Sequence, residues 1–324
     1  TPAISLLVAE CYLNQNDYPQ AKLHLARLSS LPEEDVDREK ALYLLGWIAY
    51  REEGFDEAIR QFQVLIESYP LSRYCDESQY WIAWSHFRKK RFDRAIEEFQ
   101  RLIQQYPESS FVPSSLLKIG DGYYNLQRYG QAVKTYLQVV KEYPKSKEAP
   151  EADYGILLSF FQEKKYDAFL TRVDTFLKLY PRHPLASQAL MQLGNYYQQS
   201  RMGEKALKIF RELIRLYPNT EWAEEAQFRI ALFFKNEKRW TEAIEEVEKF
   251  IKHYPKSHLL VASHMEAGDI YLLLKNYPKA LDRFEWLIKG HPQHPLVKKA
   301  YLGMETGYRG LGKTEETEKI LSEL

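Results

Sequence analysis

The stretch FDEAIRQFQVLIESYP, residues 55–70, ends on a Tyr-Pro pair that the chain repeats at a constant interval. The pair recurs every 37 residues, and its seventh copy carries histidine in place of tyrosine. A period between about 20 and 50 residues indicates stacked repeats, each of them one supersecondary unit. The copies are Tyr69-Pro70, Tyr106-Pro107, Tyr143-Pro144, Tyr180-Pro181, Tyr217-Pro218, Tyr254-Pro255 and His291-Pro292.

Each repeat is predicted to hold two helices, because apolar residues spaced three and four apart form one stripe in each half of the repeat. A small residue recurs in the first half, at Gly46, Ala83, Gly120, Gly194, Ala231 and Gly268. Another small residue recurs in the second half, at Ala21, Ala58, Ala95, Ala132, Ala206, Ala243 and Ala280. Four residues beyond it come Leu25, Phe62, Phe99, Tyr136, Phe210, Val247 and Phe284. Small residues allow the two helices to approach closely where they cross.

The ends of the helices also follow from residue type. Proline lacks an N–H and disfavours the α conformation in the residue before it, so each Tyr-Pro pair is predicted to end a second helix. Hydroxyl residues stand two places after five of the prolines, and we expect them to cap the next helix. They are Ser72, Ser109, Ser146, Thr220 and Ser257. Aromatic residues are predicted to open the second helices at Phe55, Phe92, Tyr129, Trp240 and Tyr277.

The pattern of Leu45-Gly46, Ala58, Phe62 and Pro70, repeated in the other units, resembles the tetratricopeptide repeat. The resemblance covers nearly the whole chain and implies an all-α, right-handed α-solenoid of about nine helix-turn-helix units. The family unit has about 34 residues, and we expect the three additional residues to lengthen the first helix. We predict one domain over residues 1–324, with repeats 2–38, 39–75, 76–112, 113–149, 150–186, 187–223, 224–260 and 261–297 and a partial repeat 298–324.

Two repeats depart from the pattern. Leu157 and Phe169 occupy the two small positions of the fifth repeat, and Gly203 stands where the sixth repeat should have an aromatic residue. We expect local changes of curvature at these places.

The stretches YPES with VPSS, YPKS with APEA, and LLKIGDGYY narrow the resemblance. They are similar to bacterial envelope repeat proteins, namely the outer-membrane assembly lipoprotein family and the periplasmic protein associated with the Tol-Pal system. This similarity implies a periplasmic or envelope-associated scaffold. The chain opens at Thr1 inside a helical pattern, so we expect a fragment that lacks any signal peptide or lipid anchor.

Charge and hydropathy argue against several classes of partner. Lysine and arginine number 45, as do aspartate and glutamate, so no long-range positive field favours nucleic acid or an anionic membrane. The apolar stretches, such as residues 4–9, fall far short of the roughly 20 residues that span a bilayer. We predict a protein or peptide partner, with no nucleic acid and no direct membrane span.

Several motifs suggest chemistry that their context does not support. GYRGLGKT, residues 307–314, matches the nucleotide-binding P-loop pattern, but it follows a helical stretch and falls at an inter-helix turn rather than after a strand. We therefore predict no nucleotide and no cofactor. Cys11 and Cys75 are isolated, and the nearest histidine cluster, His291 with His294, lies in a loop without the i, i+4 spacing of metal ligands. We predict neither a metal site nor catalytic residues.

One aromatic series exceeds what a core requires. In tetratricopeptide repeats, four positions of the first helix share a face and line the concave groove. At these positions the N-terminal half carries Tyr43, Trp47, Tyr50, Tyr80, Trp84, Phe87, Tyr124, Tyr154 and Phe161. An aromatic stripe at helical spacing is often core, but here the leucine, alanine and phenylalanine series already fills the core positions. These nine residues are the predicted partner-binding residues.

The sequence thus predicts a non-enzymatic scaffold that binds a protein or peptide in its groove, in bacterial envelope assembly or secretion. One alternative is a cytoplasmic adaptor or co-chaperone. The chaperone-tail readers of this family hold a carboxylate with lysine and asparagine, of which only scattered cases such as Lys40 and Asn195 are present. Another alternative is a regulatory arm of a larger enzyme.

Overall fold

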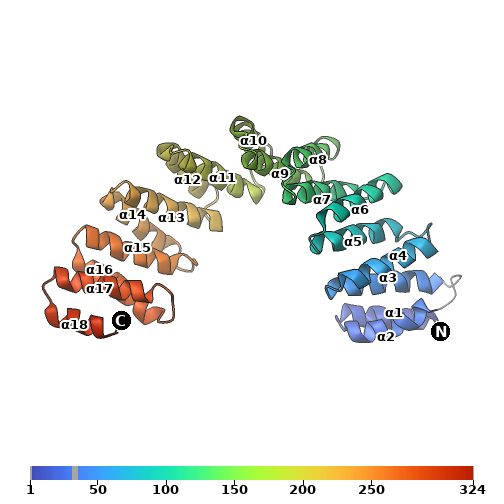
Figure 1. The fold of residues 1–324 in the computed structure, drawn as a ribbon, viewed down its shortest axis with the longest axis horizontal. Coiled ribbons are helices and arrows are strands. Elements are labelled where there is room, and N and C mark those ends of the chain that lie inside the picture. Colours follow the sequence, from blue (N-terminus) through green and yellow to red (C-terminus); the bar gives the residue numbers. More distant parts are fainter. Residues whose placement is uncertain (1, 31–35, 324) are drawn as a thin grey trace. The chain divides into compact units, whose positions relative to one another are not determined.

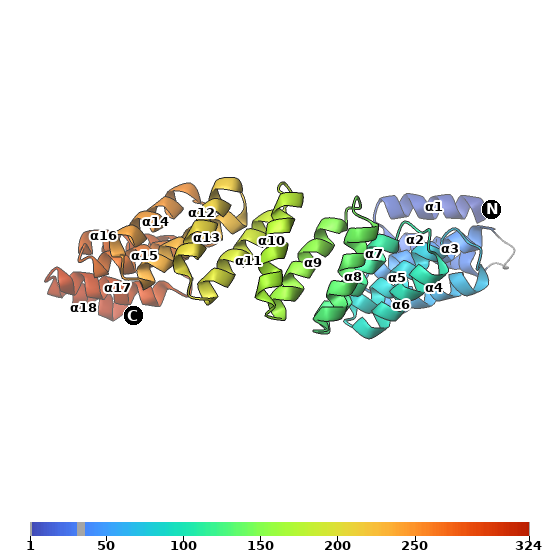
Figure 2. The same cartoon turned by 90° about the horizontal axis from the view of Figure 1, so that it is seen from above.

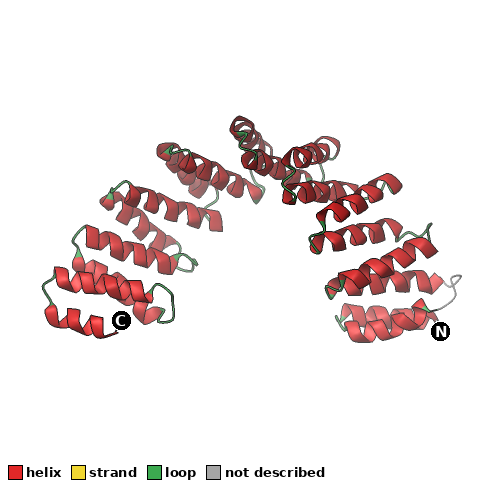
Figure 3. Ribbon diagram, viewed as in Figure 1, coloured by secondary structure: helices red, strands yellow, loops and turns green. Residues whose placement is uncertain are grey.

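The computed structural model describes residues 2–30 and 36–323, which form eighteen α-helices and contain no β-strand (Figure 3). This agrees with the predicted all-α repeat architecture. The contacts divide the chain into two compact blocks, here called the N-terminal block (Thr1–Tyr180) and the C-terminal block (Pro181–Leu324). Within each block the helices pack mainly on their neighbours in sequence (Figures 1 and 2).

Ten helices form the N-terminal block, two in each of five repeats. They are α1 (Pro2–Asn14), α2 (Tyr18–Ser29), α3 (Val36–Arg51), α4 (Phe55–Ser68), α5 (Cys75–Arg88), α6 (Phe92–Gln105), α7 (Val112–Asn125), α8 (Tyr129–Glu142), α9 (Ala149–Gln162) and α10 (Tyr166–Leu179). The C-terminal block contains α11 (Leu185–Gln199), α12 (Gly203–Leu216), α13 (Glu221–Asn236), α14 (Trp240–His253), α15 (Leu260–Leu273), α16 (Tyr277–Gly290), α17 (Val297–Gly310) and α18 (Thr314–Glu323). Odd-numbered helices are the first helices of the repeats and even-numbered helices the second.

The turn between the two helices of a repeat has one conserved geometry along the chain. Its middle residue adopts the left-handed conformation, with φ between 56° and 71°. The residues are Asn16, Glu53, Lys90, Gln127, Lys164, Arg201, Lys238, Lys275 and Gly312, again 37 apart. Only the last is glycine, so eight turns place a side chain in a conformation that L-residues adopt at a cost of about 1–2 kcal/mol.

The additional residues of the 37-residue repeat lie between repeats, which corrects the expectation of a longer first helix. The first helix α5 has 14 residues, the same as its partner α6. Residues 89–91 join α5 to α6, whereas the longer segment 106–111 joins α6 to the next repeat. The Tyr-Pro pairs end the second helices as predicted, since the tyrosine of each pair is the C-cap residue, as Tyr69 and Tyr106 illustrate.

The hydroxyl residues after the prolines cap the next helix at only one place. Thr220 is the N-cap residue of α13 and accepts a hydrogen bond from the Ala223 N–H at 3.2 Å. Ser109 accepts instead from the Phe111 N–H, before the first turn of α7, and donates to Asp76 of the preceding repeat at 2.6 Å. The general capping prediction was therefore wrong, because most of these side chains bond inside the loop. Ser72 and Ser257 follow the pattern of Ser109 by accepting from the backbone two residues on.

Glycine appears in the first helices where an aromatic ring leaves no room for a Cβ atom. A Cβ at Gly120 would lie 2.4 Å from Cε1 of Tyr136, and a Cβ at Gly155 of the next repeat would lie 2.6 Å from Cζ of the same ring. Phe284 lies in the same way between Gly268 and Gly303. Each ring therefore fills the space between consecutive first helices.

The two departures from the pattern have packing explanations. Leu157 and Phe169 are fully buried, and α9 and α10 pack less closely than the other helix pairs of repeats in this block. Bulky side chains at two positions that are otherwise small keep these helices apart. At Gly203 a Cβ would lie 2.3 Å from Cε2 of Phe233, so a ring from α13 occupies the space of the missing aromatic residue.

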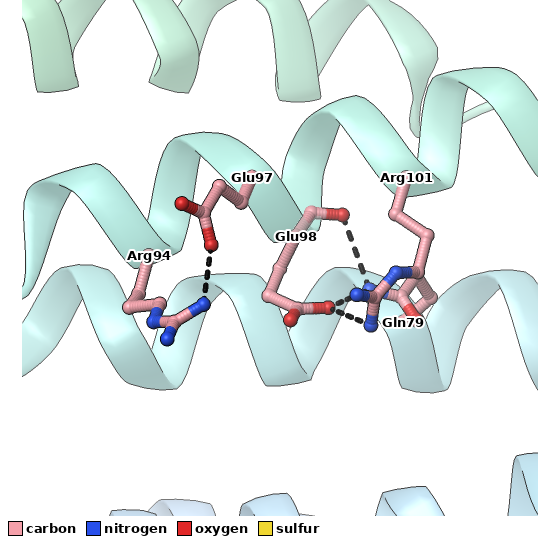
Figure 4. Close-up of polar contacts among 5 residues, drawn as sticks. All are labelled: Gln79, Arg94, Glu97, Glu98 and Arg101. Atoms are coloured by element: carbon pink, nitrogen blue, oxygen red, sulfur yellow. Dashed lines mark hydrogen bonds and ion pairs between the residues drawn. The ribbon is translucent and has the colours of Figure 1, made fainter.

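In alternate repeats, a buried polar residue of the first helix stands where neighbouring repeats carry an apolar residue. Gln79 of α5 donates from Nε2 to the backbone carbonyl and the carboxylate of Glu98, at 3.1 and 2.8 Å, and Arg101 donates to the same carboxylate (Figure 4). Four repeats later, Gln227 bonds Glu246 in the same way. The intervening position is held by Asp153, which pairs with Arg172, and the flanking repeats carry the apolar residues Leu42, Leu116 and Leu190.

The first helices lie on the inner side of each block. Consecutive first helices contact one another at α1 with α3, α3 with α5, α7 with α9, α11 with α13 and α15 with α17. In the described ranges no pair of consecutive second helices makes contacts of this extent. Elements on the inside of a curved stack are closer together than those outside, so each block curves toward its first helices and presents them as a concave surface.

Candidate functional site

The nine aromatic residues predicted to bind a partner all lie on first helices of the N-terminal block, and all are half-buried. They come from α3, α5, α7 and α9. Half-burial is compatible both with packing and with ligand contact, so the neighbours of each ring decide what it can do. The neighbours divide the series into three groups.

Tyr43 and Tyr80 connect each repeat to the next. The Tyr43 ring stacks on Tyr74 at 4.7 Å, and the Tyr80 ring stacks on Phe111 at 4.8 Å. The Tyr80 hydroxyl also lies 2.9 Å from Oγ of Ser114. Burial is the main cause of the raised pKa of both phenols, so both hydroxyls stay protonated. Because much of each ring is covered by the following repeat, these two residues stabilise the junction between repeats.

Tyr154 resembles them in part. Its ring packs on Phe176 of α10 at 6.0 Å between ring centroids. This contact lies within one repeat, so Tyr154 helps to join α9 to α10.

A second group packs on the turn inside each repeat. One ring at the end of the first helix meets the ring that opens the second helix, edge to face, with centroids 5.1–6.2 Å apart. Such pairs contribute about 0.5–1.5 kcal/mol beyond the area they bury. The pairs are Tyr50 with Phe55, Phe87 with Phe92, Tyr124 with Tyr129 and Phe161 with Tyr166.

Trp47 and Trp84 form the third group, since each indole carries a cation on its face. The Arg51 guanidinium lies 5.5 Å from the Trp47 ring, and the Lys118 ammonium lies 5.0 Å from the Trp84 ring. The Trp84 indole also stacks on Phe87 at 5.1 Å, with 24° between the planes. Two aromatic surfaces and a cation therefore meet at one point between α5 and α7.

Lys118 was missed by the sequence analysis. It lies on α7, one repeat after Trp84, and pairs with Asp121 at 2.7 Å. Asp121 in turn accepts a hydrogen bond from the Tyr136 hydroxyl at 2.8 Å. This chain of contacts fixes Lys118 above the indole. The only signal in the sequence is that Lys118 and Asp121 are three apart on a predicted helix, which gives no hint of the tryptophan.

Trp81 is a further aromatic residue that the prediction left out. Its ring packs on Tyr50 at 4.7 Å, and its indole N–H donates to Glu77 at 3.3 Å. It therefore covers the turn-facing ring of the repeat before it and forms part of the junction.

The remaining sequence motifs lie in turns. Residues 307–310 of the P-loop-like stretch belong to α17, Gly312 is the left-handed residue of the ninth turn, and Lys313 pairs with Glu316 at 3.2 Å. This is the inter-helix turn that the sequence predicted. The loop histidines His183 and His294 use Nδ1 to accept a backbone N–H two residues on, in the register of Ser109. They serve the turns between repeats.

Within the described ranges no three His, Cys, Asp or Glu side chains come together as metal ligands would. Both cysteines are free, with Cys11 exposed and Cys75 buried. No helix in the part of the chain that the structure describes is both long and apolar enough to cross a bilayer.

Comparisons with known proteins agree with the geometry of the repeats. Two family models of the tetratricopeptide repeat match residues 43–110 and 225–257. The repeats in these two ranges are tetratricopeptide repeats. A third family model, YfiO, described as an outer membrane lipoprotein, matches residues 111–237, which begin directly after the first of these ranges and overlap the second. Comparison with curated proteins gives no match.

Solved structures of tetratricopeptide repeat proteins share the fold. A tetratricopeptide repeat protein from Parabacteroides merdae aligns with a TM-score of 0.51 at 15% identity, over 83% of this chain and 98% of that one. The C-terminal part of a TPR repeat-containing protein from Cytophaga hutchinsonii aligns with a TM-score of 0.61 at 12% identity, over 80% and 98%. At such identities the likeness concerns the fold alone.

Proposed function

We propose that this tetratricopeptide repeat chain is a non-enzymatic scaffold that binds a protein or peptide on the first helices of its N-terminal block. Tetratricopeptide repeats are interaction modules, and stacked repeats offer a long concave surface for binding. The match to an outer membrane lipoprotein family over residues 111–237 supports a role in the bacterial envelope. The periplasmic or envelope location is part of the proposal.

The observation that carries the proposal is the arrangement around Trp84. Its half-buried indole is backed by Phe87 and lies beneath Lys118. Tryptophan is enriched among the residues that dominate binding energy, because a rigid ring covers a large apolar area at a small entropic cost. An ammonium beside it adds a partner for an acidic group. Trp47, two helices earlier, also carries a cation on its face, in this case Arg51 of its own helix.

Of the nine predicted residues, we assign partner contact chiefly to Trp47 and Trp84. Tyr43 and Tyr80 stack on the next repeat, and the four turn-packing rings contact the second helices. Their exposed edges complete the surface around the two indoles. This division makes the proposal testable one residue at a time.

The test replaces Trp84 by alanine and measures stability and binding together. The partner is first enriched from envelope extract on immobilised wild-type protein, identified and purified, and its affinity is then titrated. Trp84→Ala should weaken that affinity about 30-fold, equivalent to about 2 kcal/mol. Unfolding stability should fall by about 1–2 kcal/mol, since the half-buried ring loses its stacking on Phe87 and its contact with the edge of the core around Phe99.

Trp222→Ala is the matched control, because Trp222 is also half-buried but lies on α13 in the C-terminal block. It should leave the affinity unchanged. If Trp84→Ala instead costs about 3–5 kcal/mol of stability, the indole is a core residue. Normal stability with unchanged affinity would remove Trp84 from the interface. Fractionation of the full-length protein tests the envelope location separately, and recovery from the cytoplasm alone would contradict it.

A further inference from the structure

A second concave surface lies on the N-terminal block, away from the tryptophans. Helices α6, α7 and α8 enclose a hollow of about 450 Å³, here called the α6–α8 groove. Its floor includes the apolar side chains of Leu116 and Ile119 from α7. Its walls are mostly amides, with Gln100 and Gln104 on α6 and Gln131 and Gln138 on α8. Lys134 and Thr135 of α8 complete the lining.

The α8 wall of this groove differs from most second helices of the described chain. Six second helices carry ion pairs between residues three or four apart. They are α4, α6, α10, α12, α14 and α16. No such pair forms on the described residues of α8, and Lys134 has no ion-pair partner there. The four glutamine side chains likewise make no hydrogen bond with any described residue.

These exposed amides are arranged in two rows. Residues 131, 134 and 138 recur at helical spacing and form one stripe along α8, and residues 100 and 104 form another along α6. The two stripes flank the apolar floor. Each glutamine offers one carbonyl acceptor and two N–H donors, the same groups that a peptide backbone carries. Two rows of amides along an apolar floor therefore complement an extended chain.

The length of the groove and the charge of Lys134 restrict which ligands fit it. The lining residues 131–138 of α8 extend over about 10.5 Å at 1.5 Å per residue, which matches about three residues of extended peptide. Alternate side chains of an extended peptide point to one face, so an apolar side chain can reach Leu116 and Ile119. The unpaired ammonium of Lys134 favours one carboxylate at the rim.

We propose that the α6–α8 groove binds a short extended peptide segment that is largely polar and uncharged, with one apolar side chain on the floor and one acidic side chain opposite Lys134. The glutamines bond its backbone. This groove opens on a different face of α7 from the tryptophan, since Leu116 and Ile119 share one face of the helix whereas Lys118, on another, lies over Trp84.

The test uses a displayed library of random linear seven-residue peptides, selected on the wild-type chain. We expect enriched sequences that carry one Asp or Glu, and synthetic copies of them should bind at least 10-fold more weakly to Lys134→Glu. Gln131→Ala combined with Gln138→Ala should weaken the same peptides. Circular dichroism melting of each variant confirms that these surface changes leave the fold intact.

Two controls locate the effect. Lys208→Glu changes an exposed lysine at the equivalent place on α12, two repeats later, and should bind like wild type. Trp47→Ala should also bind the selected peptides normally, because Trp47 on α3 packs away from the groove, and this separates the site from the proposed partner-binding face. The proposal is overturned if selection enriches no peptide, or if the enriched peptides bind Lys134→Glu as tightly as wild type.

Discussion

His264 should make the C-terminal block sensitive to mild acid. It lies on α15 at the position held by Leu42, Leu116 and Leu190 in other repeats, and only 4% of it is exposed. Its ring stacks on Trp286 at 3.6 Å with 8° between the planes, and its Nδ1 is buried without a hydrogen-bond partner. Burial, and then the nearby Arg283 and His291, lower its pKa from 6.5 to about 4.

The size of the effect follows from that shift. Unfolded chains bind a proton to this histidine below pH 6.5, whereas the folded block binds it only near pH 4. The contribution of the neutral His264 ring to the stability of the folded block is therefore complete above pH 6.5 and is lost as the pH falls toward 4. At pH 4.5 the loss amounts to about 2–3 kcal/mol, since one pKa unit corresponds to about 1.36 kcal/mol. His264→Leu removes the titrating group and retains the shape of the apolar residues at this position.

The assay is urea unfolding at pH 7 and pH 4.5, followed by circular dichroism. Carboxylates elsewhere also titrate in this range, so the informative quantity is the pH-dependent loss in wild type minus that in His264→Leu. We expect a difference of about 2 kcal/mol or more. His258→Gln, which changes an exposed histidine, should lose stability like wild type. Equal losses in wild type and His264→Leu would refute the reasoning.

Three further predictions concern single positions. Gly120→Ala should lower the free energy of unfolding by about 1–3 kcal/mol, because its Cβ would lie 2.4 Å from the buried Tyr136 ring. Gly130→Ala, whose Cβ would have no neighbour closer than 3.9 Å, should not destabilise the protein. Equal melting temperatures for the two variants would disprove the packing argument. Lys238→Gly should raise stability by about 0.5–1 kcal/mol in thermal unfolding, because φ at this residue is 59° and glycine adopts this left-handed conformation without strain. A loss of stability would show that the lysine side chain contributes more than the strain costs. ATP with magnesium should leave the melting temperature unchanged, because Lys313 lies in an inter-helix turn; saturable micromolar binding would contradict this.

The repeat architecture was predictable from the sequence because its signals are local and recur. A proline ends a helix wherever it stands, and Gly46 or Ala58 at a fixed interval is a property of the chain alone. The left-handed turn was not predictable, since Glu53, Lys90 and Gln127 share no chemical feature that favours it. Serine was taken as a helix cap, but Ser109 finds a better partner in Asp76 of another repeat. Sequence spacing does not show such contacts.

For the candidate site, the sequence predicted only which face of the first helices carries the aromatic residues. The pattern identified the rings on α3 and α5 but could not separate Trp84 from Tyr80. That separation depends on where the next repeat places Phe111 and Lys118. The proposed α6–α8 groove has no sequence signature for the same reason, because its glutamines line one hollow only when α6 and α8 lie on either side of α7.

Gly155 and Gly303 have a consequence for the width of the binding surface. At the same position the other repeats carry larger residues, such as Trp81 and Gln192. The two pairs of first helices that include these glycines, α7 with α9 and α15 with α17, contact each other most extensively among such pairs. The volume of one residue at this position thus helps to set how closely consecutive first helices approach. We expect that a larger residue at Gly155 would move α7 and α9 apart and widen the concave surface there, without changing any residue that contacts a partner.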